Sequence, residues 1–368
     1  MKKSLLVAAL IAGFAGVAQA ETSVTLYGIV DAGIGFEQLK GSDEFGDFNA
    51  KRTGLLSGGQ SANRWGLKGT EDLGQGLQAV FVLENGFDIG TGEATQGGRM
   101  FGRQATVGLR SDAWGQLDFG RQTNIASKYL ANVVSPFGTD FGLAKAGTTF
   151  AAANSVRFDN MVMYQTPNFS GFQFGVGYSF NTSGSQQFKD SNGDEPNTRA
   201  WTTGLRYANG PLAAALTYDQ LKTAETLPAD EAGVSVKAWN LGASYDFEVV
   251  KVHAGFGQSR NGWLSPIEFA DVDLDDGGYI VDDGLKVNSY TLGLSAPVGA
   301  NGKVMAAWGM ADPRSVEDAD KQQVYSLGYT YALSKRTNVY AIGSYVKHFA
   351  FQEDLKATQV GVGLRHQF

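Results

Sequence analysis

The sequence contains no cysteine, only three histidines and only eight prolines among its 368 residues. Without cysteine the chain can form neither a disulfide framework nor a zinc–thiolate site, and it has no thiol nucleophile. Its net charge of −7 leaves no basic surplus to neutralise phosphates, which argues against nucleic-acid binding. These absences exclude several classes of protein and leave the pattern of apolar residues as the main source of information.

Residues 21–368 contain no apolar run of eighteen or more, so the sequence predicts no transmembrane helix there. The first twenty residues differ: Lys2 and Lys3 precede an uncharged apolar stretch, and residues 18–20 read Ala-Gln-Ala. This order is typical of a cleaved signal peptide, whereas a signal anchor would lack the small-residue cleavage site. We expect residues 1–20 to be removed.

The main feature that is present is a strict alternation of apolar and polar residues. Phe172, Phe174 and Val176 alternate with Gln173 and Gly175, for example. Successive side chains of a strand point to opposite faces, so each such segment has one apolar and one polar face. A soluble β-sandwich shows the same pattern, but aromatic residues at strand ends and a polar face of Gly, Ser, Thr and Asn favour a membrane barrel around water. The pattern recurs in residues 201–207, 239–247, 325–331 and 360–368.

Short turn sequences recur every 35 to 55 residues, an interval that fits two strands, one long loop and one turn. Seven such turns, with both termini at the same end, predict an all-β fold: one transmembrane antiparallel barrel of about 16 strands over residues 21–368. A barrel of this size leaves an aqueous channel. The turns lie around Asp72, Ala113, Asn168, Asn209, Glu248, Ala300 and Lys335.

Residues 122–153 form an unusual connection, because among them only Lys128, Asp140 and Lys145 are charged. A long, weakly charged loop is unlike a solvated one, so we expect it to fold into the pore and narrow it. A packed outer loop or a contact between subunits would also explain its composition. The other long connections are polar and are expected to be irregular: residues 38–61, 182–197, 222–233 and 261–284.

Charged residues within the strands should face the water-filled interior, because an arginine facing lipid at the membrane centre costs roughly 2–4 kcal/mol. Alternation with apolar neighbours places Arg64, Glu84 and Arg157 on the inner face, together with Lys68 and Asp159.

Arg103 does not fit this rule. Alternation puts it on the same face as Val107 and Leu109, which is the expected outer face. A β-bulge, or a neighbouring subunit that covers this face, would remove the conflict.

Several segments resemble the general diffusion porins of Gram-negative bacteria, and most closely their β-proteobacterial branch. The resemblance runs along the whole chain in order. It is carried by residues 24–31 (Val-Thr-Leu-Tyr-Gly-Ile-Val-Asp), 64–74, 119–121, 164–169 and the terminal 366–368 (His-Gln-Phe).

The resemblance implies a sixteen-stranded homotrimeric barrel in the outer membrane, with the third long loop inside the pore. It also implies a constriction in which Arg64, Arg103 and Arg157 form a basic wall and Glu84 and Asp140 lie opposite. The family's loop often reads Pro-Glu-Phe-Gly-Gly-Asp. Here the glutamate is missing, so we expect a weaker transverse field and a weak preference for anions. The corresponding loop residues are Pro136, Phe137 and Gly138.

The terminal Phe368 resembles the signal that the outer-membrane assembly machinery reads. The expected partners are therefore this machinery, outer-membrane lipid and lipopolysaccharide, and the ions and small hydrophilic solutes that pass the pore. Neither a cofactor nor a bound metal is expected.

Three alternatives remain open at this stage. An enzyme barrel would need a nucleophile beside a base, and none of the three histidines lies in such a motif. A substrate-selective channel and an adhesin-like surface barrel share the fold. Residues 271–282 superficially match a calcium loop, but Asp276 occupies the position where a glycine is required and Asp282 the position of a glutamate.

Overall fold

The computed structural model describes residues 23–43, 46–189, 191–265, 268–269, 272–273, 280–315 and 319–368. The expected signal peptide and most of the acidic segment 271–282 lie outside these ranges.

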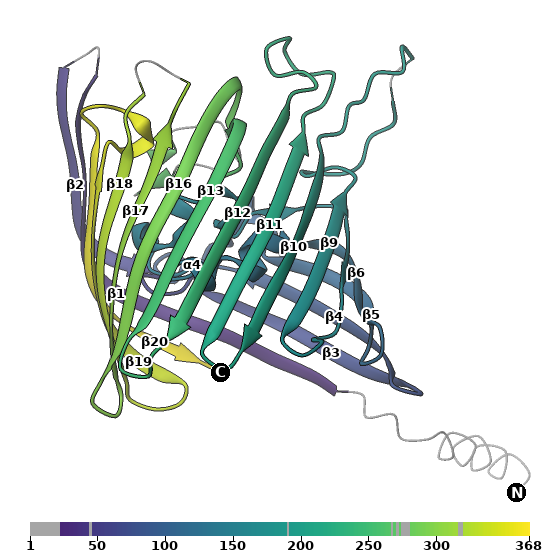
Figure 1. Cartoon of the computed structure of the whole chain (residues 1–368), viewed down its shortest axis with the longest axis horizontal. Helices are drawn as coiled ribbons and strands as arrows, with labels where there is room; N and C mark the ends of the chain where they lie inside the picture. The colour runs from purple at the N-terminus through teal and green to yellow at the C-terminus, as the bar shows by residue number, and fades with distance from the viewer. Residues whose placement is uncertain are drawn as a thin grey trace, which may run out of the picture.

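Sixteen antiparallel strands within the described ranges form a closed barrel, as the sequence predicts (Figure 1). Each strand pairs with the next along the chain, and the last strand closes on the first, with Ile29 opposite Gln367. The strands are β1 (Ser23–Asp43), β3 (Arg64–Gly74), β4 (Leu77–Gly86), β5 (Gln104–Ser111), β6 (Gly115–Thr123), β8 (Met161–Gln165), β9 (Phe172–Ser179), β10 (Arg199–Asn209), β11 (Leu212–Lys222), β12 (Ser235–Asp246), β13 (Lys251–Trp263), β16 (Ile280–Val298), β17 (Gly302–Pro313), β18 (Gln322–Ala332), β19 (Thr337–Lys347) and β20 (Lys356–Gln367).

Shorter elements lie in the connections between these strands. Among the described residues, no helix is long and apolar enough to cross a membrane. The additional strands are β2 (Gly46–Ser57), β7 (Arg157–Phe158), β14 (Glu268–Phe269) and β15 (Val272–Asp273). The helices are α2 (Thr95–Gly98), α3 (Ile125–Tyr129), α4 (Ala131–Val134), η1 (Gly142–Ala144), η2 (Ala146–Thr148), η3 (Ala151–Ala153) and η4 (Phe349–Phe351).

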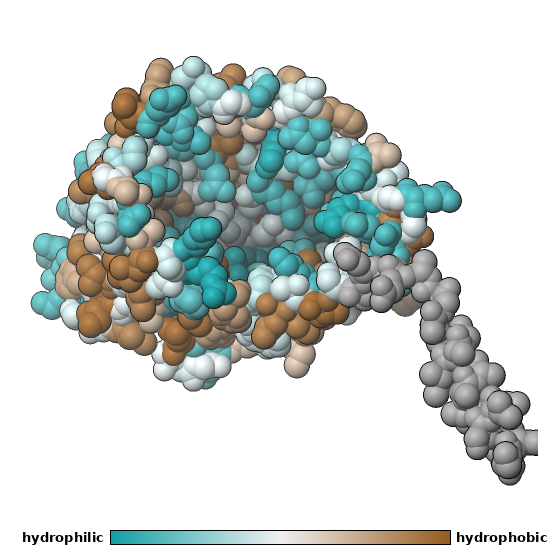
Figure 2. Space-filling model, turned by 90° about the horizontal axis from the view of Figure 1, so that it is seen from below, coloured by the Kyte–Doolittle hydropathy of each residue, from teal (hydrophilic) through white to brown (hydrophobic). Residues whose placement is uncertain are grey.

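The two faces of the wall differ as the alternation predicts. Large apolar side chains are exposed on the outside, including Leu216, Leu241 and Leu327. Seen along the barrel, hydrophilic residues surround the hollow interior and hydrophobic residues occupy the outside (Figure 2). A barrel with this polarity has its apolar surface toward lipid and its polar surface toward water.

The first long connection differs from the expected irregular loop. Residues 32–43 of β1 pair with residues 57–46 of β2, so most of residues 38–61 form a β-hairpin that continues beyond the wall. The same part of β1 pairs with β20 on its other edge. Backbone groups are therefore hydrogen-bonded on both sides of β1, which favours continued strand over loop despite the polar sequence.

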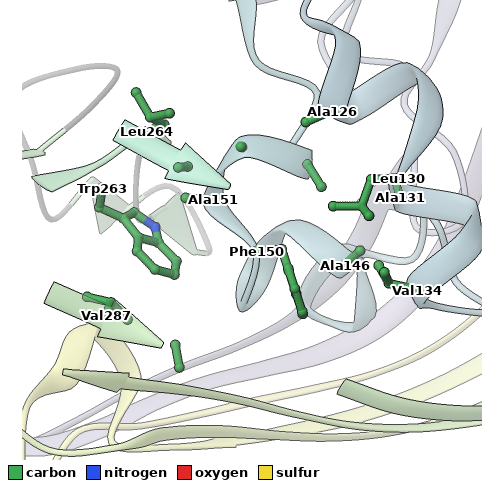
Figure 3. Close-up of a cluster of buried hydrophobic side chains, with 14 of the residues drawn as sticks. Ala126, Leu130, Ala131, Val134, Ala146, Phe150, Ala151, Trp263, Leu264 and Val287 are labelled. Atoms are coloured by element: carbon green, nitrogen blue, oxygen red, sulfur yellow. The ribbon is translucent and has the colours of Figure 1, made fainter. Parts of the chain in front are cut away.

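The third long connection, residues 124–156, lies inside the barrel, as expected from its low charge (Figure 1). Figure 3 shows its buried residues Phe150 and Ala151 in one cluster with Trp263 and Val287 of the wall. The core of this protein is thus the space between the loop and one side of the wall, rather than the centre of a closed globule.

Candidate pore constriction

The third loop packs against glycines on the inner face of the wall. A Cβ atom added at Gly175 would lie 2.6 Å from Ile125, and one added at Gly255 would lie 2.6 Å from Val134. The missing side chains leave the room that the loop occupies, and this brings the loop backbone close to the strands. Other inner-face glycines meet loop side chains in the same way: Gly204, Gly242, Gly257, Gly293, Gly309 and Gly328.

Buried polar groups hold the base of the loop. Asn124 caps α3, where its side chain accepts a hydrogen bond from the Ser127 amide, and its own amide donates to Asp219 on β11 at 2.8 Å. At the end of α4, the Val133 carbonyl lies 3.0 Å from Nδ1 of the buried His253 on β13. These contacts fix both short helices against neighbouring strands.

The tip of the loop is attached to the first connection and to the last strand. The Phe141 amide donates to the Gln60 carbonyl at 2.7 Å, and the Ser61 hydroxyl donates to Asp140 at 3.1 Å. The Leu143 amide donates to the Gln359 side chain at 3.1 Å. The loop therefore spans the interior, from strands β9–β13 to the first connection and β20.

Pro136, Phe137 and Gly138 lie in this loop, but they anchor it instead of projecting into water. A Cβ atom added at Gly293 would lie 2.5 Å from Pro136. Phe137 is only 2% exposed, and its ring contacts the Phe141 ring edge-on at 5.5 Å. Gly138 has φ of 57°, a conformation that favours glycine.

Arginines and carboxylates gather near Asp140 of the loop, from β3, β4 and the connections beside them. Arg103 forms an ion pair with Glu84 at 2.7 Å, and Arg157 donates to the Arg103 carbonyl at 3.1 Å. Arg64 interacts electrostatically with Arg103, Glu84 and Asp140. The structure therefore brings together the five charged residues selected from the sequence.

The expected arrangement of these charges is wrong in one respect. Glu84 does not lie opposite the arginines: it belongs to the same wall and is paired with one of them. The Tyr27 hydroxyl also donates to Glu84, at 2.9 Å. Among the five, only Asp140 approaches the arginines from the loop.

The structure explains why alternation placed Arg103 on the outer face: Arg103 precedes β5 and is not part of the alternating strand. Neither a bulge within the strand nor a covering subunit is needed to explain its position. It follows the second connection, and its backbone amide donates to the Glu84 carbonyl at 3.2 Å. Its direction is set by this contact and by the ion pair with Glu84.

The alternation argument for Arg157 is also wrong, although the residue reaches the cluster. Asn160 has φ of 48° and interrupts the strand between β7 and β8. As a result, Phe158 pairs across the ladder with the fully buried Gln122, and Arg157 pairs with Thr123. Residues that pair across a ladder lie on the same face of the sheet, so Phe158, and not Arg157, shares the face of Gln122. The contact between Arg157 and the Arg103 backbone, rather than alternation, places Arg157 in this group.

The cluster also contains three arginines that the sequence argument did not select. Arg99 and Arg121 both bind Asp159, at 2.9 Å and 2.6 Å. Arg365 on β20 interacts electrostatically with Asp140 and Asp31. Alternation with the exposed Leu364 could have identified Arg365, but no sequence pattern marks Arg99, which lies in an irregular connection.

The cluster as a whole has a positive excess. The arginines are Arg64, Arg99, Arg103, Arg121, Arg157 and Arg365, and the carboxylates are Asp31, Glu84, Asp140 and Asp159. Asp31 also accepts hydrogen bonds from Tyr340 and from the Ser61 amide, at 2.7 Å each. In the loop, burial raises the pKa of the Asp140 carboxyl above its usual range, while Arg64 opposes this shift. Protonation of Asp140 would increase the positive excess further.

No group of three or more potential metal ligands occurs within the residues that the structure describes. The acidic sequence that superficially matches a calcium loop lies mostly outside them.

Comparison with known proteins gives the family. A Gram-negative porin family model matches residues 7–348. The chain belongs to the Gram-negative porins. It is 53% identical to an outer membrane porin protein of Bordetella pertussis and 35% identical to outer membrane porin protein 32 of Delftia acidovorans, over the whole of each chain. Among solved structures, an anion-selective porin from Comamonas acidovorans is 32% identical, covering 95% of this chain and 100% of its own, with a TM-score of 0.72.

This porin is thus an outer-membrane channel, and its polar interior is the path through the membrane. The resemblance noted in the sequence is confirmed. In this setting the short turns and the long connections lie at opposite ends of the wall, and the third loop narrows the path between them.

Proposed function

We propose that this porin passes ions and small hydrophilic solutes by passive diffusion, with a preference for anions at the level of the third loop. The observation that carries the proposal is the positive excess of the arginine cluster beside Asp140. Passage needs no catalytic step and no cofactor, because the solute moves down its own gradient.

Electrostatics in a narrow passage supports this selectivity. Low-dielectric walls focus the field of charges that line a water-filled constriction, so a small excess of one sign affects permeating ions strongly. Two of the carboxylates, Glu84 and Asp159, are already paired with arginines. The name of the 32% identical solved structure, an anion-selective porin, agrees with this direction.

Reversal potentials in a planar bilayer with a salt gradient test the proposal. The reversal potential of the wild-type channel should have the sign of an anion-selective channel. Arg157→Gln should shift it toward the value of a cation-selective channel, because one positive charge is lost. Arg110→Gln is the matched control: Arg110 lies beside the turn between β5 and β6 and contacts Gln78, away from the cluster. A cation-selective wild type, or equal shifts for both variants, would contradict the proposal.

We further infer that three copies assemble through the apolar outer face around β1, β19 and β20. A groove there is lined by Ile34, Leu55, Val339 and Val362, with the small Gly33 and Ala341 between them. Small residues beside large apolar ones let two barrel walls approach closely. Closure of single channels in three equal steps would support the trimer, and strictly single steps would contradict it.

A further inference from the structure

The last connection of the barrel, residues 348–355 between β19 and β20, has an unusual backbone. Three of its residues have a positive φ although none of them is glycine: His348 (54°), Ala350 (55°) and Phe351 (64°). Residues with a Cβ atom, and bulky ones above all, rarely adopt this conformation, so the surroundings must hold it in place. Clusters of such residues are typical of segments that switch or that position another part of a protein.

Contacts with neighbouring connections hold the last connection in this strained form. The Phe351 ring packs edge-on against the Trp263 ring, with centroids 5.5 Å apart. The Asp320 amide donates to the Phe351 carbonyl at 2.8 Å, and the Asp320 carboxylate lies 3.4 Å from the His348 ring. Trp263 belongs to the same buried cluster as Ala151 of the third loop (Figure 3). The last connection therefore shares a core with the loop that narrows the channel.

The Gln322 side chain joins the last connection to the third loop directly. Gln322 is the first residue of β18 and is only 3% exposed. Its side-chain oxygen accepts a hydrogen bond from the Ala350 amide at 2.9 Å, and its side-chain nitrogen donates to the Thr148 carbonyl at 2.6 Å. A carboxamide carries both an acceptor and a donor, so one side chain satisfies both backbone groups. Because a buried polar group is costly to leave unpaired, a movement of either partner acts on the other.

The series of contacts continues to the tip of the third loop. The Thr148 hydroxyl donates to the Leu143 carbonyl at 2.9 Å, and the Leu143 amide donates to the Gln359 side chain at 3.1 Å. Leu143 follows closely after Asp140, the loop carboxylate that faces the arginines. An unbroken series of hydrogen bonds therefore leads from the Ala350 amide to the part of the loop that narrows the channel.

We propose that Gln322 is a positioning residue that transmits the conformation of the last connection to the third loop, so that a mechanical load on this connection changes passage through the constriction. Coupling of this kind needs contiguous contacts and an element with two arrangements. The hydrogen bonds through Gln322 provide the contacts. The strained connection provides the element, because it relaxes when the contacts that hold it are disturbed. The inference concerns the shape of the constriction and holds whichever ion the channel prefers.

The test uses the absence of cysteine from the chain. Glu353→Cys places a single thiol on the exposed part of the last connection, where a biotin label binds streptavidin as the load. In single-channel recordings of the folded protein, streptavidin should raise the frequency of partial closures about threefold or more. In combination with Gln322→Met the load should have no such effect, because methionine has a similar size but forms neither hydrogen bond.

Two controls separate transmission from simple obstruction of the channel mouth. Phe188→Cys carries the same load on the fourth connection, half-way around the barrel, where Phe188 is exposed. Whatever its effect on the recordings, that effect should not depend on Gln322. Gln323→Met replaces the adjacent glutamine, whose side chain accepts a hydrogen bond from the Tyr325 hydroxyl on the same strand. This variant should leave the response to the load at Glu353→Cys intact.

A second variant keeps the test informative if Gln322→Met does not fold, as judged by heat-dependent migration in gels. Gln322→Glu retains an acceptor for the Ala350 amide, but it donates to the Thr148 carbonyl only when its carboxyl is protonated. The response to the load should therefore be present at low pH and lost as pH rises. A residue that only fills space would show no such dependence.

Three outcomes would overturn the proposal. They are no response to the load at Glu353→Cys in the otherwise wild-type chain, equal responses with and without the Gln322 side chain, and a response of Gln322→Glu that does not vary with pH. Reversal potentials recorded in the same experiment distinguish the two proposals. A cation-selective channel whose load response depends on Gln322 would contradict the proposed anion preference and leave the coupling intact.

Discussion

At the scale of single residues, Asp140 is the loop carboxylate whose protonation depends on its surroundings. It lies in the third loop, accepts a hydrogen bond from Ser61 and faces several arginines. Burial raises its pKa above the usual carboxyl range. As pH falls, Asp140 therefore becomes neutral earlier than an exposed carboxyl would, and the positive excess of the cluster grows.

The prediction is that anion preference increases on mild acidification. Reversal potentials measured across a pH series should move to the anion side at a higher pH than expected for ordinary carboxyls. Asp140→Asn should already show the stronger anion preference at neutral pH. Its reversal potential should then lack the change that the wild type shows at the higher pH. Asp88→Asn is a suitable control: although burial raises the Asp88 pKa, hydrogen bonds from the Ser57 side chain and from the Thr91 and Gly90 amides outweigh this and keep the pKa below its usual value. An unchanged pH profile in Asp140→Asn would contradict the assignment.

Alternation within regular strands was enough to predict inner-face residues such as Arg64 and Glu84. It failed for Arg103 and Arg157, since one precedes its strand and the other lies beyond a break at Asn160. The pairing of Glu84 with Arg103 also could not be read from sequence, because it depends on how the second connection returns to the wall. Periodicity carries information only where the backbone keeps one conformation.

At the scale of elements, the third loop and the inner-face glycines depend on each other. The loop has little charge and many small apolar residues, and the wall has glycines where the loop lies against it. A larger side chain on the wall would compete with the loop for the same space. Such a change should disturb the constriction while leaving the strand pairing intact.

We expect Gly255→Val to displace α4, because even its Cβ would lie 2.6 Å from Val134 and 3.2 Å from Thr291. Single-channel recordings should then show altered, noisier conductance and weaker ion selectivity. The matched variant is Gly343→Val, at a strand glycine where an added Cβ meets nothing within 4 Å. If both variants conduct like the wild type, the inner-face glycines are not needed to position the third loop.

The inward position of the third loop was predictable because low charge and length are properties of the sequence itself. The first connection was not, since residues 38–61 are polar and still form most of a hairpin. Its strands are stabilised by backbone pairing on both edges of β1, and one of these edges is supplied by β20, more than three hundred residues later. Long-range pairing of this kind leaves no local signal.

At the scale of the whole molecule, the barrel is held closed where its two ends meet. Phe368 and Gly28 exchange two backbone hydrogen bonds, each 3.1 Å long, and the Phe368 ring lies against the position of the missing Gly28 side chain. An open sheet edge would leave backbone groups without partners in lipid. The final residue therefore has a structural role in closure, besides the assembly signal that the family resemblance implies.

Two experiments with one variant separate these roles. Deletion of Phe368 should reduce the folded, heat-modifiable fraction in the outer membrane of expressing cells. If the residue acts chiefly through recognition by the assembly machinery, the same variant should refold from urea into detergent micelles as completely as the wild type. If closure dominates, refolding should fall as well, because the deletion removes both hydrogen bonds to Gly28. Phe368→Tyr, which keeps the ring and the backbone contacts, is the control expected to behave like the wild type in both assays. Normal insertion of the deletion variant in cells would exclude both roles.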